Sequence, residues 1–258
     1  ISNLSKSLEE VSGTEVVSNS KLIWMLNDRG NKSKIYRVSK KGKIVKVIKV
    51  NAKNNDWEDL TSDEKGNLYI GDFGNNESRR KNLAILKVNA KDLSSSKKVE
   101  VEKISFYYPN QTNFPPKSKQ LFFDAESFFF HKNSFYIFTK SRVKSKFGKT
   151  ALYKIPATKG NHKAEFISDF NSCDEMNCWI TSADISNDGK KVALLSPSSV
   201  LIFSDYNKDD FLSGKLTKIP FNYNSQKEGI TFKDNNTLLI TDEKSHGVGG
   251  GFYELKIN

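Results

Sequence analysis

The feature that most constrains the fold is a pattern that occurs five times along the chain. In each unit a small polar or acidic residue precedes a short β run, a polar turn follows, and a second β run ends in a polar residue. The units begin at residues 12, 58, 126, 182 and 228, so the successive steps are 46, 68, 56 and 46 residues. Self-similarity at about this period is typical of repeat architectures, in which each repeat is one supersecondary unit.

One or two further β runs follow each pair, such as Ile44–Val50 after the first and Phe252–Ile257 after the last, and helical periodicity is almost absent. Four β runs in each of five units predict an all-β fold, a five-bladed β-propeller with four-stranded antiparallel blades. Residues 2–8 are expected to add the fourth strand of the last blade, closing the ring without an open edge. A β-sandwich with hairpin insertions is the alternative, but it does not explain the five-fold spacing.

This spacing predicts one domain over the whole chain. Hydrophobic residues make up 36% of it, enough for a sizeable core. No apolar run approaches the roughly 18 residues that a membrane helix needs. The predicted blades cover about 11–51, 58–106, 126–168, 182–220, and 228–258 together with 1–8.

The charge balance is basic, with 41 Lys and Arg against 30 Asp and Glu, or 41 − 30 = +11. Five of these basic residues are arginines, and the rest are lysines spread along the chain. Base reading and bidentate phosphate contacts favour arginine, whereas scattered lysines usually mark a solvated surface. Nucleic acid is therefore not an expected partner.

Two cysteines, Cys173 and Cys178, have four residues between them. A zinc site would need further Cys or His ligands nearby, and none are present in the sequence around them. We expect a local disulfide, with two free thiols as the alternative. A disulfide favours an extracytoplasmic protein, whether secreted, periplasmic or attached to the cell surface. Because the sequence begins at Ile1 and shows no signal peptide, a lipid anchor upstream stays open as the means of attachment.

The first residue of each unit is expected near the mouth of the central channel, because the innermost strand of each blade lines that channel. Three carboxylates brought together there would repel one another unless protons or a cation intervened. Carboxylate, hydroxyl and backbone oxygens suit Ca²⁺, which accepts six to eight oxygen ligands. The alternative is that these are polar residues wetted by channel water or partners for backbone amides. The predicted calcium ligands are Ser12, Glu58, Glu126, Ser182 and Glu228.

Loops between the second and third β runs open onto the same face as these residues. Four of the five arginines fall in them, beside three aspartates, and such clusters suit a phosphate, sulfate or carboxylate ligand. The alternative is that they are solvated turn residues, with Asp and Asn present for turn chemistry. The predicted ligand-binding residues on this face are Asp28, Arg29, Asp72, Arg79, Arg80, Lys140, Arg142, Asp242 and His246.

A catalytic set is not evident. Gly247–Gly251 lacks the Lys-Ser/Thr ending of a P-loop and precedes a β run, not a helix. His246 is the histidine placed where it could act as an acid or base, and the sequence has no Gly-x-Ser-x-Gly elbow. The sequence therefore leaves the catalytic residues unassigned and does not decide whether the chain is an enzyme.

The order Ser, Glu, Glu, Ser, Glu at the unit starts resembles the five-bladed propeller of the calcium-activated nucleotidases, the soluble apyrase family. The matching stretches are Val11–Gly13, Asp56–Glu58, Asp124–Glu126, Thr181–Ala183 and Lys227–Gly229. The resemblance implies a calcium ion on the axis, held by residues at the blade starts. The segments Asn54–Leu60 and Tyr69–Asn76 are also similar to secreted bacterial propellers of unassigned activity.

The expectation is thus an extracytoplasmic propeller with axial calcium and a basic face that binds an anionic small molecule or a protein partner. A calcium-dependent phosphohydrolase is the alternative. It would use the metal to polarise a phosphoryl oxygen and Arg29, Arg79, Arg80 or Arg142 to neutralise charge. A structural module that binds calcium without turnover is the third reading.

Overall fold

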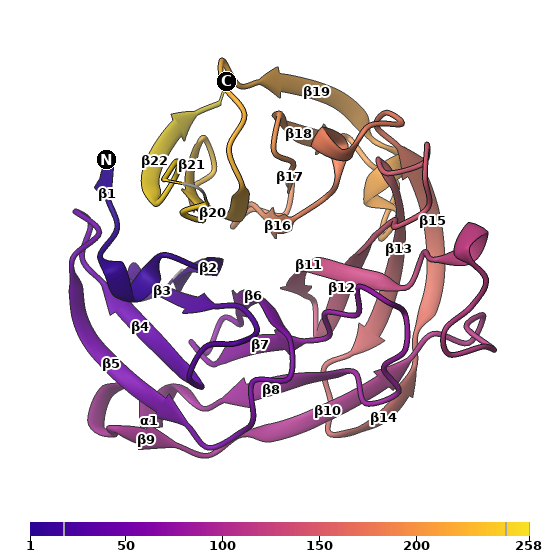
Figure 1. Ribbon diagram of the computed structural model, residues 1–258. Helices are drawn as coiled ribbons and strands as arrows, with labels where there is room; N and C mark the ends of the chain where they lie inside the picture. Colours follow the sequence, from indigo (N-terminus) through magenta and orange to yellow (C-terminus); the bar gives the residue numbers. More distant parts are fainter. Residues whose placement is uncertain (18, 246, 258) are drawn as a thin grey trace.

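A computed structural model describes residues 1–17, 19–245 and 247–257, and it confirms the predicted five-bladed β-propeller. Figure 1 shows the five sheets arranged around a central axis, with strands β2, β6, β11, β16 and β20 nearest to it. In the described part of the chain, no helix is long and apolar enough to cross a membrane.

The chain forms the blades in sequence order. Blade 1 consists of β2 (Val11–Val17), β3 (Leu22–Asn27), β4 (Lys34–Val38) and β5 (Ile44–Val50). Blade 2 consists of β6 (Trp57–Ser62), β7 (Leu68–Asp72), β8 (Ala84–Val88) and β10 (Glu102–Tyr107). Blade 3 consists of β11 (Asp124–His131), β12 (Ser134–Lys140), β13 (Lys149–Pro156) and β15 (Glu165–Asn171).

The last two blades complete the ring. Blade 4 consists of β16 (Ser182–Ile185), β17 (Lys191–Leu195), β18 (Ser199–Ser204) and β19 (Lys215–Pro220). Blade 5 consists of β20 (Lys227–Asp234), β21 (Thr237–Asp242), β22 (Gly251–Lys256) and the N-terminal β1 (Ser2–Asn3). Strand β1 pairs antiparallel with β22, so the N-terminal segment closes the ring as predicted. This strand is shorter than the expected segment 2–8, because Lys6–Leu8 forms a 3-10 helix instead.

Two blades carry a fifth strand that the sequence did not predict. Strand β9 (Lys98–Val99) pairs parallel with β5 of blade 1, and β14 (Gly160–Lys163) pairs parallel with β10 of blade 2. Each comes from a connection in the following blade, and the connection before β9 also contains helix α1 (Ala90–Ser95). Since an unpaired outer edge invites association with other chains, these short strands protect two edges.

Buried apolar side chains among the described residues form clusters between neighbouring blades rather than one central core. Trp24 and Trp57 pack between blades 1 and 2, and Phe73 packs with Phe128 between blades 2 and 3. Both faces of each blade are therefore covered. The inner strands are left to present polar side chains to the axis.

Candidate functional site: an axial cavity at the blade starts

The inner strands of four blades contain a β-bulge at the predicted ligand position. The pairing register shifts around Ser12 in β2, Glu58 in β6, Glu126 in β11 and Glu228 in β20. A bulge places two residues opposite one and re-aims the extra side chain. These four side chains consequently turn out of the regular strand alternation and line one cavity at the axis.

This axial cavity has a volume of about 470 Å³ and opens on the face that carries the blade starts. Its polar lining comes from all five blades. The charged and aromatic side chains in the lining are Asp28, Arg29, Asp56, Glu58, Glu126, Lys140, Arg142, Trp179, Glu228 and Glu243.

Ser182 does not join the other four predicted ligands. Strand β16 has no bulge, since Ser182 pairs regularly with Leu195, and Thr181 lines the cavity in its place. The Ser182 hydroxyl instead donates to Asp59 Oδ2 at 2.9 Å and accepts from the Ile230 amide at 3.1 Å. At blade 4, Thr181 rather than the predicted Ser182 therefore lines the cavity, and Ser182 instead joins the inner strands of blades 2 and 5.

Glu126 is held by two cations from its own blade. Lys140 Nζ forms a short ion pair with Glu126 Oε2, and Arg142 Nη2 lies 3.1 Å from Oε1. Arg142 Nε also donates to the buried Asp124 at 2.6 Å. The Trp179 ring packs against both cations, each 4.8 Å from its centroid. Burial lowers the pKa of Lys140, but the charges of Glu126 and Glu228 outweigh it and raise that pKa overall.

Glu58 and Glu228 differ from Glu126 in their side-chain partners. Among the described residues, no side chain donates a hydrogen bond to either carboxyl or forms an ion pair with it. Glu58 is 8% exposed, so its carboxyl is nearly withdrawn from water. Burial, followed by the charges of Glu126 and Asp56, raises the pKa of Glu58 well above its usual value. Burial and Glu126 raise the pKa of Glu228 to about 8. The buried Glu58 thus needs a proton or a cation, and the half-buried Glu228 favours one as well.

The absence of a side chain at Gly74 leaves room for the carboxyl groups of Glu58 and Asp56 to approach each other. A Cβ atom at this position would lie 1.9 Å from Glu58 Oε1 and 2.8 Å from Asp56 Oδ2. Both oxygens therefore face the same small volume beside the Gly74 backbone. Burial raises the pKa of Asp56 to about 6, although Arg29 and Arg80 oppose the shift.

The charge of the lining differs from the expected basic face. Among the described lining residues, six acidic side chains stand against three basic ones, Arg29, Lys140 and Arg142. Lys140 and Arg142 are already paired with carboxylates, and Arg29 lies 3.5 Å from Asp56. Once its carboxyls are ionised, this lining would repel an isolated anion and attract a cation.

The remaining predicted ligand residues mostly brace loops. Asp72 accepts from Arg80, Asn55 and the Asp56 amide, and it is 3% exposed. Asp242 is fully buried and accepts from Ser225, Tyr253 and the Gly251 amide. Neither residue lines the cavity, and both carboxylates are engaged in these hydrogen bonds. His246 lies outside the described residues.

Arg79 and Arg80 are adjacent in sequence but differ in burial and in their partners. The Arg80 guanidinium, 17% exposed, donates to Asp72 Oδ1 at 2.9 Å and to the Gly74 carbonyl at 2.7 Å. Arg79 is 64% exposed and pairs with Glu77, which is 74% exposed. Neither arginine lines the axial cavity.

We expect Arg80→Ala to lower the free energy of unfolding by about 2–3 kcal/mol, because it leaves the buried Asp72 without its cation. Arg79→Ala should stay within about 0.5 kcal/mol of the unmodified protein, since exposed ion pairs contribute little. Chemical denaturation of the two variants side by side measures both. Equal stabilities would contradict the bracing role of Arg80.

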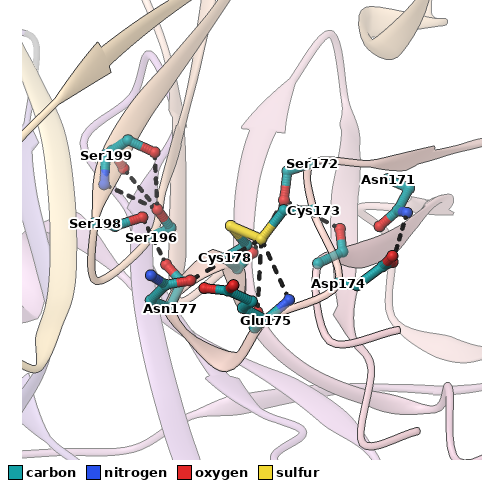
Figure 2. Close-up of a disulfide and its surroundings, with 11 residues drawn as sticks. Asn171, Ser172, Cys173, Asp174, Glu175, Asn177, Cys178, Ser196, Ser198 and Ser199 are labelled. Atoms are coloured by element: carbon teal, nitrogen blue, oxygen red, sulfur yellow. Dashed lines mark hydrogen bonds between the residues drawn. A yellow bond between two sulfur atoms is a disulfide. The ribbon is translucent and has the colours of Figure 1, made fainter. Parts of the chain in front are cut away.

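The predicted disulfide is present and shapes one wall of the cavity. Cys173 and Cys178 are bonded and close a loop that carries Met176 and Asn177 into the lining, and Trp179, which follows Cys178, lines the cavity as well. Figure 2 shows this loop beside the turn Ser196–Ser199. Ser198 Oγ donates to the Asn177 carbonyl at 2.8 Å, and Trp179 Nε1 donates to the Ser141 carbonyl at 2.6 Å. The covalent loop is thereby tied to blades 3 and 4.

A second group of acids lies deeper on the axis, below the cavity: Glu15, Asp59 and Asp184, called here the lower acidic cluster. Asp184 accepts from the Phe232 and Ile185 amides, and Glu15 accepts from Ser62 and Thr231. Burial raises the pKa of Asp184 to about 7 and that of Glu15 well above its usual value. Most of these hydrogen bonds join different blades, so the cluster links the inner strands to one another below the cavity.

Sequence reasoning did not find Trp179, Asp56 or the lower acidic cluster. Polar residues inside otherwise apolar inner strands, such as Glu15 and Asp184, were the available signal. Among the described residues, no three His, Cys, Asp or Glu side chains already lie in a metal-holding arrangement.

A five-bladed propeller with a polar axial cavity defines the class of this protein. No protein-family model and no curated protein sequence matches it. A chain in the crystal structure of a nidogen–laminin complex superposes with a TM-score of 0.51 at 9% identity, covering 96% of this chain and 76% of that one. A gluconolactonase from Xanthomonas campestris gives 0.50 at 12%, covering 96% and 72%. A streptogramin B lyase gives 0.44 at 14%, covering 99% and 71%. At these identities the likeness shows the fold alone.

Proposed function

We propose that the axial cavity binds a calcium ion and, through it, an anionic ligand. The observation that carries this proposal is Glu58, a carboxyl 8% exposed, without a hydrogen-bond or ion-pair partner among the described residues and directed into the cavity. Leaving a charge buried and unpaired is costly, so an ionised Glu58 would favour a bound cation over an empty cavity.

The residues present fit a hard cation. Glu58 and Asp56 direct oxygens into the space beside Gly74, and Glu228 offers a third carboxylate without a partner of its own among the described residues. The Ser12 hydroxyl lines the same cavity. Calcium completes its shell with water and tolerates irregular geometry, which suits carboxylates spread over several blades. The resemblance of the blade starts to the calcium-activated nucleotidases supports the same choice.

An anionic ligand would be drawn mainly by the metal. Lys140 and Arg142 are engaged with Glu126 and Asp124, which leaves Arg29, 62% exposed, as the most accessible cation of the lining. Trp179, Met176 and Pro197 would cover the ligand from the disulfide side. The Cys173–Cys178 disulfide supports an extracytoplasmic setting, where calcium is abundant and thiols oxidise.

A calcium-dependent phosphohydrolase would use the same cavity, with the metal polarising a phosphoryl oxygen. In the described lining, this proposal assigns Glu58 and Glu228 to the metal, and the other carboxyls already have side-chain partners. Binding without turnover is therefore the function that we favour. Incubation with nucleotides and simple phosphate esters, with and without calcium, separates the two. Calcium-dependent release of phosphate would establish the enzyme.

Thermal unfolding tests the cation site. Chelator-treated protein should gain about 5 °C or more in Tm in millimolar calcium, because a ligand that binds the folded state stabilises it by mass action. Glu58→Gln should lose most of this gain. Glu77→Gln, a change on an exposed loop of the same face, should keep all of it. An equal gain in the Glu58 variant would place the calcium elsewhere.

A further inference from the structure

Lys140 ends strand β12 with its ammonium group inside the axial cavity. The residue is 5% exposed, its Nζ pairs with Glu126 Oε2, and it lies 4.8 Å from the centroid of the Trp179 ring. Both contacts hold it toward the axis. A buried lysine is rare unless it is paired, so this placement is specific.

Among the described residues, the other blades have no cation at the end of the second strand, where blade 4 has Leu195. The residues that pair with the start of the inner strand are Asn27 in blade 1, Asp72 in blade 2 and Asp242 in blade 5. Blade 3 alone among these pairs Asp124 with a lysine. The negative charges of Glu126 and Glu228 act on this ammonium, and its own charge acts on Glu58. It therefore faces carboxylates from three blades.

We propose that Lys140 is a resident counter-ion that competes with the calcium ion for Glu126. The inference rests on the proposed function, since it concerns the same cavity. An ammonium and a metal ion on Glu126 Oε2 would repel each other, so coordination by Glu58, Glu126 and Glu228 is expected to move Lys140 off that oxygen. The displaced ammonium stays beside Trp179 and becomes available to an anionic ligand. Calcium binding and anion binding are then coupled through one side chain.

The test is the calcium affinity of Lys140→Met, measured with calcium alone by isothermal titration calorimetry on chelator-treated protein. Removing the competitor should strengthen binding at least 10-fold. Lys149→Met is the matched control: it lies in the same blade, pairs with Asp169 on the surface and is 41% exposed, so its affinity should not change. An affinity of Lys140→Met equal to or weaker than that of the unmodified protein would overturn the inference.

A second pair of variants keeps the test valid if Lys140→Met folds poorly. Glu126→Gln leaves Lys140 as an uncompensated charge in the cavity and should weaken calcium binding at least 10-fold. The double variant Glu126→Gln/Lys140→Met should recover the part of that loss that comes from repulsion by the ammonium, whereas the loss of the Glu126 ligand remains. No recovery in a folded double variant would refute the competition.

The two proposals fail differently. If the unmodified protein binds no calcium while Lys140→Met binds it, the calcium-dependent function is wrong and the counter-ion role stands. If the unmodified protein binds calcium and Lys140→Met shows no gain, the function stands and the counter-ion role falls. Absence of binding in every variant overturns both.

Discussion

Replacing Asp124 by alanine is expected to lower the free energy of unfolding by about 3–5 kcal/mol, because it breaks a buried ion pair and orphans backbone donors. Asp124 is fully buried. Its Oδ1 accepts from the Asn75 amide at 2.7 Å and the Ala125 amide at 3.0 Å, and its Oδ2 accepts from Arg142 at 2.6 Å. One side chain thus joins a loop of blade 2 to blade 3 and fixes a cation of the axial cavity.

Denaturant unfolding of three proteins measures this effect. Asp124→Asn keeps an oxygen for the two amides and should lose less than Asp124→Ala, since it removes mainly the charge opposite Arg142. Asp174→Ala, in the exposed disulfide loop, should change stability by less than about 1 kcal/mol. A loss below about 1 kcal/mol in Asp124→Ala would show that the blade 2–blade 3 junction does not depend on this carboxylate.

The second large effect is a fall in stability between pH 5 and pH 8 in the absence of calcium. Burial raises the pKa of Asp184 from 3.8 to about 7, and that of Glu228 from 4.5 to about 8. Folded protein therefore holds protons that the unfolded chain has released, so the stability present below pH 4 is lost progressively up to these folded values. A difference of one in pKa is worth about 1.4 kcal/mol, so even part of these shifts amounts to several kcal/mol.

Other groups oppose this slope weakly in that window. Burial lowers the pKa of His131, which adds stability as pH rises through its titration. The carboxyls of Asp188, Asp209 and Asp234, whose pKa values are lowered, titrate below the window. The free energy of unfolding is measured at pH 5, 6.5 and 8. Its fall with pH should be smaller in Glu228→Gln than in the unmodified protein, and unchanged in Glu254→Gln. Millimolar calcium should flatten the same slope, since it stabilises the ionised carboxylates. Stability that rises with pH without calcium would contradict this account.

The repeat spacing predicted the blades because each four-stranded unit needs a fixed set of β runs and turns. Ring closure by the N-terminal segment was predicted correctly for the same reason, since the last unit lacked its fourth run. The added strands β9 and β14 were missed: at two and four residues, they carry no periodic signal. Their pairing depends on edges that exist only after the blades have formed.

Four of the five predicted axial residues line the cavity, and the reason that the fifth does not is local. A bulge depends on backbone geometry and cannot be read from Ser182 alone, which looks like Ser12 in sequence. The loop arginines illustrate a second limit. Arg80 and Arg142 lie in similar loops, yet Arg80 bonds within its own loop while Arg142 reaches the axis. Partner choice of this kind is set by tertiary contacts.

The exchanged strands also constrain how a chain like this can change its number of repeats. Blade 2 lends β9 to blade 1 and receives β14 from blade 3, so these three repeats share hydrogen-bonded edges. Deleting or duplicating the coding sequence of blade 2 would remove or misplace a strand of its neighbour. In the described residues, blade 4 neither lends nor receives a strand. We therefore expect a gene-level gain or loss of one repeat to be tolerated best at blade 4.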